Sequence, residues 1–324
     1  MLSAPVNPLL FGEAMVQANF ADSLMDCVRR KQSQLVVGLD PRLDRLPAQL
    51  WPPDAEHTAA AAAEAILVFN GAVLDAVAEH VVAVKCQAAF YEEFGSEGMR
   101  AYAATLRAAR DRQLIAIGDV KRNDIASTAA AYASGHLGSV GGSGAPPSDF
   151  VADAVTVNPY LGSDGVMPFV EAAAANGRGV FALVKTSNPS SVEIQNLESG
   201  GRPVYVHVGE LVEEWGRPYR GQCGYSLLGA VVAATFPGDL ATLRKLMPGT
   251  LFLVPGLGAQ GGRVGDVAGA FDARGLGAVV NSSRDIIFAW ERAPYNQEFG
   301  EARWQEAIET AAADIRARLW AATH

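Results

Sequence analysis

The stretch LIAIGDVKRNDI, residues 114–125, passes from an apolar run into a group of charges. The run Leu114–Ile117 predicts a buried strand, and Asp119 and Lys121 lie where that strand ends. Side chains two apart on a strand share a face, so we expect these two to point the same way, and Asp124 to follow the turn and open a helix. Because three charges at the end of a buried strand cost desolvation free energy, the stretch indicates a functional site.

The same residues have a structural alternative. In it, Asp124 caps the following helix and the remaining charges form a solvated ion pair. Since short motifs often match by chance, the wider organisation of the chain has to separate the two interpretations.

A unit of one apolar strand followed by one helix recurs along the whole chain. The predicted strands lie at Leu35–Leu39, Val81–Val84, Leu114–Gly118, Ala154–Val157, Val180–Val184, Leu227–Val232, Leu251–Val254 and Ala278–Asn281. The predicted helices lie at His57–Ala78, Glu97–Arg110, Ile125–Leu137, Asp164–Asn176, Val206–Trp215, Leu240–Leu246, Val264–Ala273 and Ala302–Leu319. Apolar strands that alternate with helices indicate a parallel α/β sheet, and eight repeats favour a closed (β/α)8 TIM barrel over an open doubly wound sheet.

We expect one barrel domain over residues 33–324, preceded by an N-terminal helical extension over residues 1–32. Phe20, Leu24 and Val28 stand at helical spacing and predict a helix that covers the bottom of the barrel. Residues 138–147 are predicted to be a surface insertion. Residues 188–224, between the fifth and sixth strands, are numerous enough to hold a lid as well as a helix.

Composition narrows the class of protein. The chain has 324 residues, 49% of them hydrophobic, so it can bury a large core. A net charge of -9 argues against nucleic acid or an anionic membrane as the main partner, and any anionic ligand must then be held by local groups. Three scattered cysteines without a C-x-x-C pair and five dispersed histidines disfavour a disulfide framework and a metal centre. Without a charged leader or a long apolar run, we expect a cytoplasmic protein.

Polar residues end nearly every predicted strand, which is where barrel enzymes carry their catalytic groups. They are Asp40, Lys85, Asp119 with Lys121, Asn158–Tyr160, Lys185–Pro189, Pro255–Gly262, and Asn281–Arg284. Turn formation explains Asp40 equally well, and Lys85 has a snorkelling surface lysine as its alternative. The glycine-rich loop 255–262 with Arg284 predicts a phosphate site, the alternative for Arg284 being a surface charge.

Asp40, Lys85, the run 119–125, the loop PGLGAQGG at 255–262, and Arg284 together resemble the orotidine 5'-phosphate decarboxylase family. The likeness spans roughly residues 34–320 and is closest to the longer bacterial subfamily, given VNPYLG at 157–162 and KTSNP at 185–189. The chain departs from the short form of the family at residues 138–147, 188–224 and 281–283.

The resemblance implies decarboxylation of orotidine 5'-monophosphate to uridine 5'-monophosphate, the last step of de novo pyrimidine nucleotide synthesis, by a homodimer without metal or organic cofactor. It implies Lys121 as the proton donor to C6 and Asp119 beside the departing carboxylate. Lys85 and Asp124 would complete the charge network, with Asp124, Ile125 and Thr128 entering the neighbouring subunit's site. Asp40 would bind ribose and Ser187 the pyrimidine, and the phosphate end would meet the loop from Pro255 through Gln260, with Ser283 and Arg284.

Three other interpretations stay open. A metal-dependent phosphosugar aldolase or decarboxylase of the same superfamily shares D-x-K-x-x-D, although a lysine after strand two disfavours it. Lys121 or Lys85 could form a Schiff base, but flanking carboxylates favour the charged ammonium, which is a poor nucleophile. A noncatalytic nucleotide-binding barrel would bind its ligand without turnover.

Overall fold

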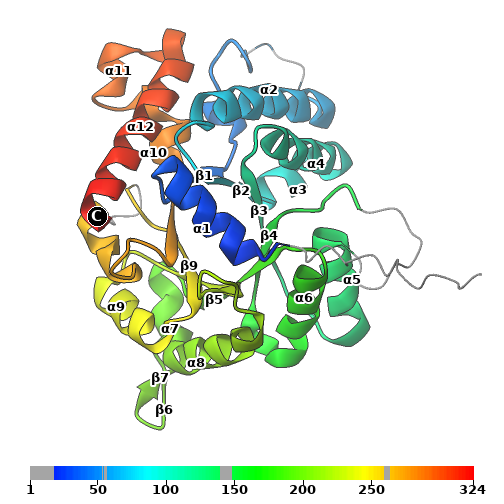
Figure 1. The fold of residues 1–324 in the computed structure, drawn as a ribbon. Coiled ribbons are helices and arrows are strands. Elements are labelled where there is room, and N and C mark those ends of the chain that lie inside the picture. Colours follow the sequence, from blue (N-terminus) through cyan, green and yellow to red (C-terminus); the bar gives the residue numbers. More distant parts are fainter. Residues whose placement is uncertain (1–17, 53, 55–56, 139–147, 259–262) are drawn as a thin grey trace, which may run out of the picture.

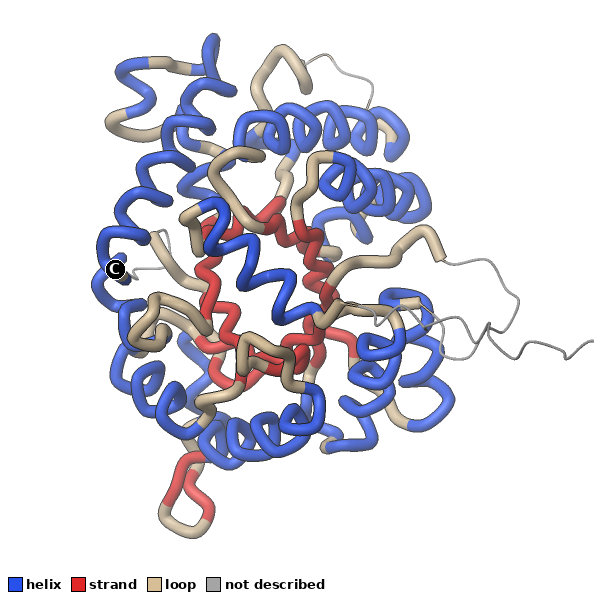
Figure 2. The backbone as a smooth tube through the Cα atoms, viewed as in Figure 1, coloured by secondary structure: helices blue, strands red, loops and turns tan. Residues whose placement is uncertain are grey.

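The computed structural model describes residues 18–52, 54, 57–138, 148–258 and 263–324 (Figure 1). Its centre is a closed barrel of parallel strands in the order β1-β10-β9-β8-β5-β4-β3-β2. The strands are β1 Leu35–Leu39, β2 Ala83–Gln87, β3 Ile115–Arg122, β4 Ala154–Val157, β5 Gly179–Lys185, β8 Ser226–Val232, β9 Thr250–Val254 and β10 Ala278–Ser282. The predicted (β/α)8 barrel is confirmed, and Figure 2 shows the ring of strands surrounded by helices.

The helices around the ring are α2 Ala59–Val77, α4 Gly95–Asp111, α5 Ala126–Leu137, α6 Ser163–Ala175, α8 Val204–Gly216, α9 Pro237–Leu246 and α12 Trp304–Thr323. One predicted helix is wrong, because Val264–Ala270 forms a 3-10 helix, η5. Gly265 and Gly269 lie within it, and each glycine disfavours an α-helix by about 1 kcal/mol relative to alanine. Strands β2 and β3 run further than predicted toward their carboxyl ends, so that Lys85 and Lys121 lie within strands rather than after them.

Shorter elements fill the connections. They are η1 Leu43–Arg45, α3 Ala89–Glu92, η2 Pro159–Leu161, η3 Pro189–Ser191, α7 Val192–Gln195, β6 Glu198–Ser199, β7 Arg202–Pro203, η4 Arg217–Tyr219, α10 Arg284–Ile287, η6 Ala289–Glu291, α11 Tyr295–Glu298 and η7 Glu301–Arg303. The connection 188–224 therefore holds α8, as expected, together with a β6–β7 hairpin that projects from the barrel in Figure 1. That these residues also form a lid over the barrel stays a prediction. The predicted insertion lies outside the described residues except for Gly138.

Helix α1, Phe20–Lys31, lies across the end of the barrel where the strands begin (Figure 2). The Phe20 ring meets the Phe181 ring edge to face, with centroids 6.1 Å apart. A Cβ atom on Gly179 would lie 2.3 Å from the Phe20 ring, so only glycine permits this approach. The Asp22 carboxylate accepts the backbone N–H groups of residues 222 and 223 at 3.0 and 2.7 Å. The helix thus covers the bottom of the barrel as predicted, while the domain division at residue 33 stays a prediction.

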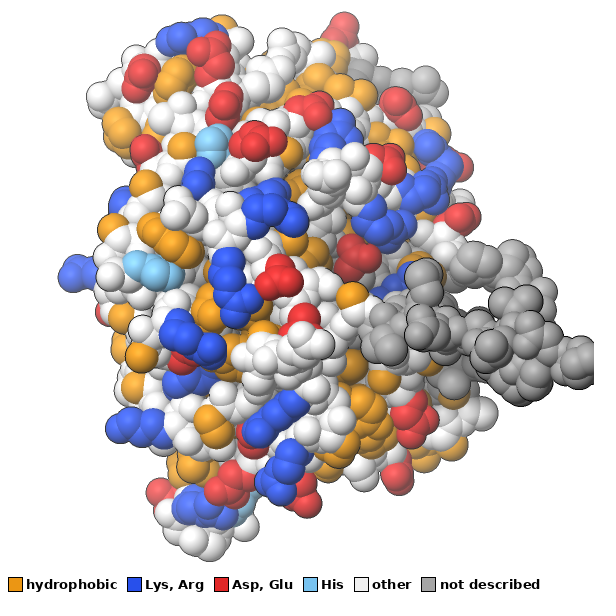
Figure 3. Space-filling view, viewed as in Figure 1, with side chains coloured by type: hydrophobic (Ala, Val, Ile, Leu, Met, Phe, Trp, Pro, Cys, Tyr) orange, Lys and Arg blue, Asp and Glu red, His pale blue; other side chains and the backbone are white. Residues whose placement is uncertain are grey.

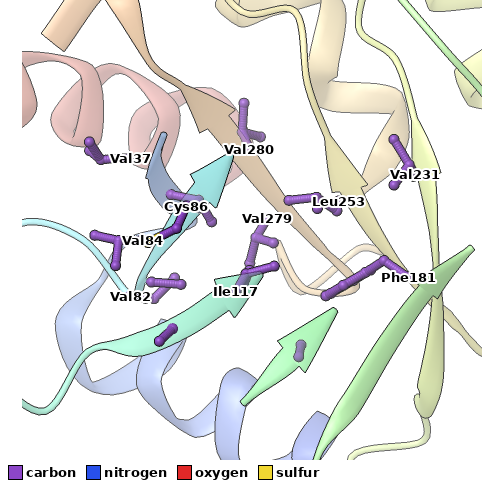
Figure 4. Packing of buried hydrophobic residues seen from close by; sticks show 14 of the residues in the cluster. Val37, Val82, Val84, Cys86, Ile117, Phe181, Val231, Leu253, Val279 and Val280 are labelled. Carbon is purple, nitrogen blue, oxygen red and sulfur yellow. The ribbon is translucent and has the colours of Figure 1, made fainter. Parts of the chain in front are cut away.

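Apolar side chains fill the barrel and the layer between strands and helices. Figure 4 shows Phe181, Leu253 and Val279 extending from β5, β9 and β10 toward one another. Among the described helices, α2 is long and apolar enough to cross a membrane, which departs from the expectation for this chain. Half of that apolar window is buried, and α2 packs against α4 and α12, as a core helix does. On the α1 face, Lys and Arg side chains are interspersed with Asp and Glu (Figure 3).

Candidate active site

A cavity of about 220 Å³ opens where the barrel strands end. Its lining includes eight of the residues predicted for the site, namely Asp40, Lys85, Asp119, Lys121, Ser187, Pro255, Ser283 and Arg284. Leu183, Val231, Leu253 and Leu257 supply an apolar part of the wall. Among the described residues, three cations and two carboxylates line the cavity, a local balance of +1 in a chain of net charge -9. The cavity can therefore hold an anion that the protein as a whole would repel.

The carboxylate of Asp119 lies between two lysines. Its Oδ2 atom accepts from Lys85 Nζ at 2.8 Å and its Oδ1 atom accepts from Lys121 Nζ at 2.6 Å. The Lys85 and Asp119 side chains are only 7% and 8% exposed, whereas that of Lys121 is 45% exposed. Asp119 and Lys121 therefore share a face, as the strand periodicity predicts. The alternative of a solvated ion pair within the run is wrong for Asp119, because its carboxylate is buried, although its partner Lys121 is partly exposed.

Electrostatics keep the buried Lys85–Asp119 pair charged. Burial by itself would raise the pKa of Asp119, but Lys85 and Lys121 outweigh it and hold that pKa well below its ordinary range. Burial would likewise lower the pKa of Lys85, yet the Asp119 and Asp40 carboxylates raise it above its ordinary value. A charged lysine is a proton donor, so the cluster supplies positive charge and a transferable proton at the cavity wall.

The backbone at Lys121 adopts an uncommon conformation. Its φ angle is 44°, in the left-handed region that costs a non-glycine residue about 1–3 kcal/mol. Ala126, at φ 48°, marks the other end of the β3–α5 connection. The pairing of β3 with β4 also shifts register between Gly118 and Arg122. Strain of this kind concentrates at functional sites, where the surrounding structure enforces it.

Residues after β1, β9 and β10 form another part of the cavity wall. The Asp40 Oδ1 atom is buried and meets no donor among the described residues, so it is available to a ligand hydroxyl. Gly38 makes room for Ser283, because a Cβ atom there would lie 1.8 Å from Ser283 Oγ. Gly258, at φ 79°, similarly allows Asp285 to approach the loop after β9. Gln260, the predicted phosphate donor of this loop, lies outside the described residues.

Three predicted residues do not line the cavity of their own chain. Asp124 is half-buried in the β3–α5 connection, and Ile125 and Thr128 are exposed beside it. The predicted helix cap is wrong: α5 begins at Ala126 with Ile125 as its N-cap, and Asp124 Oδ1 accepts the N–H of Ile125 instead, at 2.8 Å.

Several polar residues of the cavity were not assigned roles from the sequence. Gln87 Nε2 donates to Asp119 Oδ2 at 3.2 Å, and Thr156 Oγ1 donates to Asp119 Oδ1 at 2.8 Å. Asn281 and Thr186 complete the polar wall. Period-two alternation carries part of this signal, since Gln87 is two residues after Lys85.

Two polar strand ends face away from the cavity. The Lys185 side chain is completely buried on the other side of β5, with its ammonium 4.9 Å from the Tyr205 ring centroid and 4.5 Å from that of Phe236. Tyr160, after β4, is 81% exposed. A residue at the end of a strand therefore lines the cavity only if its side chain also lies on the inner face of the barrel.

Over the described parts of the chain, no group of three His, Cys, Asp or Glu side chains is arranged to hold a metal ion. The expected absence of a metal or cofactor stays a prediction, because only an assay can decide it.

The fold and the cavity together define a (β/α)8 barrel with a charged small-molecule site at the carboxyl ends of its strands. The family model described as "Orotidine 5'-phosphate decarboxylase / HUMPS family" matches residues 33–293. A Rhodopirellula baltica protein named orotidine 5'-phosphate decarboxylase is 44% identical over 300 residues, covering 93% of this chain and 98% of the relative. A Caldicellulosiruptor saccharolyticus protein of the same name is 40% identical over 276 residues, covering 84% and 90%.

A solved structure gives the same result. That of Leishmania donovani OMP decarboxylase has a TM-score of 0.71 and 31% identity, covering 94% of this chain and 99% of that one. The chain belongs to the orotidine 5'-phosphate decarboxylase family.

Proposed function

We propose that this protein converts orotidine 5'-monophosphate to uridine 5'-monophosphate and CO2, without a cofactor, in de novo pyrimidine nucleotide synthesis. The observation that carries the proposal is the buried Asp119 carboxylate held between Lys85 and Lys121 on the wall of a cavity. Family membership and the names of the relatives support the choice of substrate.

The chemistry requires a positive charge and a proton at one carbon. When the C6–carboxylate bond breaks, CO2 leaves and its bonding electrons stay on C6 as a carbanion. The Lys121 ammonium stabilises that charge and then donates its proton to C6, and solvent later reprotonates the amine. Asp119 presents a like charge to the substrate carboxylate, and this repulsion is relieved as CO2 departs. Lys85 keeps Asp119 ionised and in place.

One lysine does not account for the whole rate enhancement. A unit charge about 4 Å from the carbanion contributes about 4 kcal/mol at an effective dielectric constant near 20. Enzymes lower barriers by roughly 8–23 kcal/mol, so binding energy from the remote parts of the substrate has to supply the rest. We assign that role to Asp40 at the ribose, Ser187 at the pyrimidine, and Arg284 with Ser283 at the phosphate.

We further propose a homodimer in which Asp124, Ile125 and Thr128 enter the partner's cavity. None of the three lines the cavity of its own chain, which leaves them free for this role. Ile125 itself is 51% exposed, and Leu161, which lies near Gly165 as Asp124 does, is 44% exposed. A dimer interface would cover such residues.

The dimer has a direct test by subunit exchange. Mixing inactive Asp124→Ala and Lys121→Ala subunits should restore one intact site in each heterodimer. An absence of recovered activity after demonstrated exchange would overturn the shared site. We also infer a cytoplasmic location, which the free thiols of Cys27, Cys86 and Cys223 support.

The central experiment follows the ultraviolet absorbance of orotidine 5'-monophosphate as it is consumed, with and without a chelator. We expect equal turnover in both conditions and almost none for Lys121→Ala. Loss of activity in the chelator would favour the metal-dependent aldolase or decarboxylase instead. Binding without turnover would favour the noncatalytic barrel, and near-normal turnover of Lys121→Ala would overturn the lysine assignment.

A further inference from the structure

Thr156, on β4, is 1% exposed and lies between Asp119 and the backbone of Lys121. We propose that Thr156 is a positioning residue that sets the geometry of the Asp119–Lys121 pair for proton transfer. This inference rests on the proposed function, because it takes Lys121 as the proton donor.

The hydroxyl of Thr156 makes two hydrogen bonds whose directions are fixed. A hydroxyl has one proton to donate and lone pairs to accept with. Asp119 is a carboxylate and only accepts, so the proton points to its Oδ1 atom, 2.8 Å away. The backbone N–H of Lys121 only donates, so it points to Thr156 Oγ1, at 3.0 Å. One side chain thus links the carboxylate of one site residue to the main chain of the other.

The strand register explains why this hydroxyl is needed. Gly118 pairs with Val155 and Arg122 pairs with Val157, so residues 119–121 of β3 all face the single residue 156 of β4. In a regular parallel ladder, backbone carbonyls would accept the N–H groups of β3. At Lys121 the Thr156 hydroxyl takes the place of that acceptor. An unpaired N–H would be costly in this interior, and the left-handed φ of 44° at Lys121 makes an alternative pairing harder.

Fixing the main chain of Lys121 matters because its side chain is partly exposed and its ammonium is held by Asp119. That side chain is 45% exposed, and its ammonium contacts Asp119 Oδ1, the same atom that Thr156 contacts. When Lys121 gives its proton to the substrate, its charged contact with Asp119 is lost. The Thr156 hydroxyl still holds both the Asp119 carboxylate and the Lys121 backbone at that moment.

The test compares variants that differ by one hydroxyl. Thr156→Val removes the hydroxyl and keeps the shape, and Thr156→Ser keeps the hydroxyl. Thr250→Val is the matched control: Thr250 is also fully buried, its Oγ1 donates to Glu213 Oε2 at 2.6 Å, and it lies at the start of β9, at the far end of the barrel. The measurements are kcat and KM for orotidine 5'-monophosphate, the Kd of uridine 5'-monophosphate by calorimetry, and Tm.

We expect Thr156→Val to lower kcat by about 10- to 100-fold, because a displacement of about 1 Å at a reacting group has an effect of this size. The Kd of the product should stay within about threefold, since no proposed ligand contact is removed. Thr156→Ser should recover kcat to within about threefold, because it supplies the same donor and acceptor. Thr250→Val should lower Tm and leave kcat unchanged.

Two results would overturn the inference while leaving the proposed function intact. One is a Thr156→Val variant whose kcat stays within about twofold of an active wild type. The other is a Thr156→Ser variant as slow as Thr156→Val, since the hydroxyl would then not be the cause. Thr156→Ala repeats the comparison if the valine variant does not fold. A folded wild type that consumes no orotidine 5'-monophosphate would instead refute the proposed function, and this inference with it.

Discussion

Replacing Asp119 with asparagine removes the negative charge that lies between two ammonium groups. Asparagine keeps the shape of the side chain, but its amide N–H donors would face lysine donors. At an effective dielectric constant near 20, the attraction across the 2.8 Å Lys85–Asp119 contact is about 6 kcal/mol. Most of it offsets the desolvation of the two buried groups. Breaking such a pair by removing one partner costs about 3–5 kcal/mol of stability, because the other charge is left buried.

Most of the stability lost in Asp119→Asn should come from the broken contact with Lys85, whose charge is left buried. The Lys121 side chain is 45% exposed, so solvent screens its share of the interaction. Asp26→Asn is the matched control, because it breaks the exposed Arg29–Asp26 pair, whose side chains are 46% and 71% exposed. We expect no measurable change there. Urea unfolding followed by tryptophan fluorescence, at fixed protein concentration, gives both free energies of unfolding.

The pH dependence provides a second check with a definite sign. The folded-state pKa of Lys85 is raised above its ordinary 10.5, so its stabilisation is complete below pH 10.5 and is lost as pH rises through the folded value. The pKa of Asp119 is lowered from 3.8, so its stabilisation is present above pH 3.8 and is lost as pH falls through the folded value. Between pH 3.8 and pH 10.5, this cluster should make the free energy of unfolding of the wild type change little with pH.

The Asp119→Asn variant should behave differently in the alkaline range. Burial lowers the pKa of Lys85, and in this variant Asp119 no longer counteracts that effect, although Asp40 still does. The folded-state pKa of Lys85 should therefore fall below 10.5. The unfolded chain would bind more protons than the folded one, and the variant should gain stability as pH rises toward 10.5. The difference in free energy of unfolding between the wild type and the variant should therefore become smaller between pH 7 and pH 10. A constant difference, or a loss no larger than that of Asp26→Asn, would refute this reasoning.

Three further predictions concern the bottom of the barrel and the phosphate wall. Phe20→Ala opens a void against Phe181 and should destabilise the fold by about 3–5 kcal/mol without changing kcat, so a lower Tm with altered kinetics would contradict it. Arg284→Ala removes a charged hydrogen-bond donor and should raise KM by about 10- to 100-fold in steady-state kinetics, while a change confined to kcat would exclude a binding role. Gly38→Ala places a Cβ atom 1.8 Å from Ser283 Oγ and should weaken binding of uridine 5'-monophosphate in calorimetry; unchanged affinity would show that Ser283 is not a ligand.

Much of the architecture follows from local patterns. Most barrel strands are buried on both sides along most of their length, as β1 and β9 are throughout, so short apolar runs in the sequence indicate where they lie. The 3-10 helix at residues 264–270 could not be told from an α-helix by its pattern, because its apolar residues suit a helix while its two glycines weaken one. The β6–β7 hairpin could not be predicted, because two-residue strands carry no periodicity.

Some residues of the candidate site could also be predicted from the sequence, and others could not. The positions of Asp119, Lys121 and Lys85 could be predicted, because alternation and the carboxyl ends of strands assign them a face and an end. Lys185 shows the limit of the second rule, because it ends β5 but points away from the cavity. Thr156 carries no charge and belongs to no motif, so its role depends on a register shift that neither strand reveals alone.

By itself, the sequence determined that this chain is a (β/α)8 barrel and which charged groups stand at the ends of its strands, because both properties depend on residues close together along the chain. Only the tertiary structure decided how those groups act together. The partners of Asp119 include Lys85 and Thr156, which lie 34 and 37 residues away along the chain. They meet because parallel pairing sets β2, β3 and β4 side by side, and the opposite charges brought together there keep Lys85 and Asp119 charged in spite of their burial.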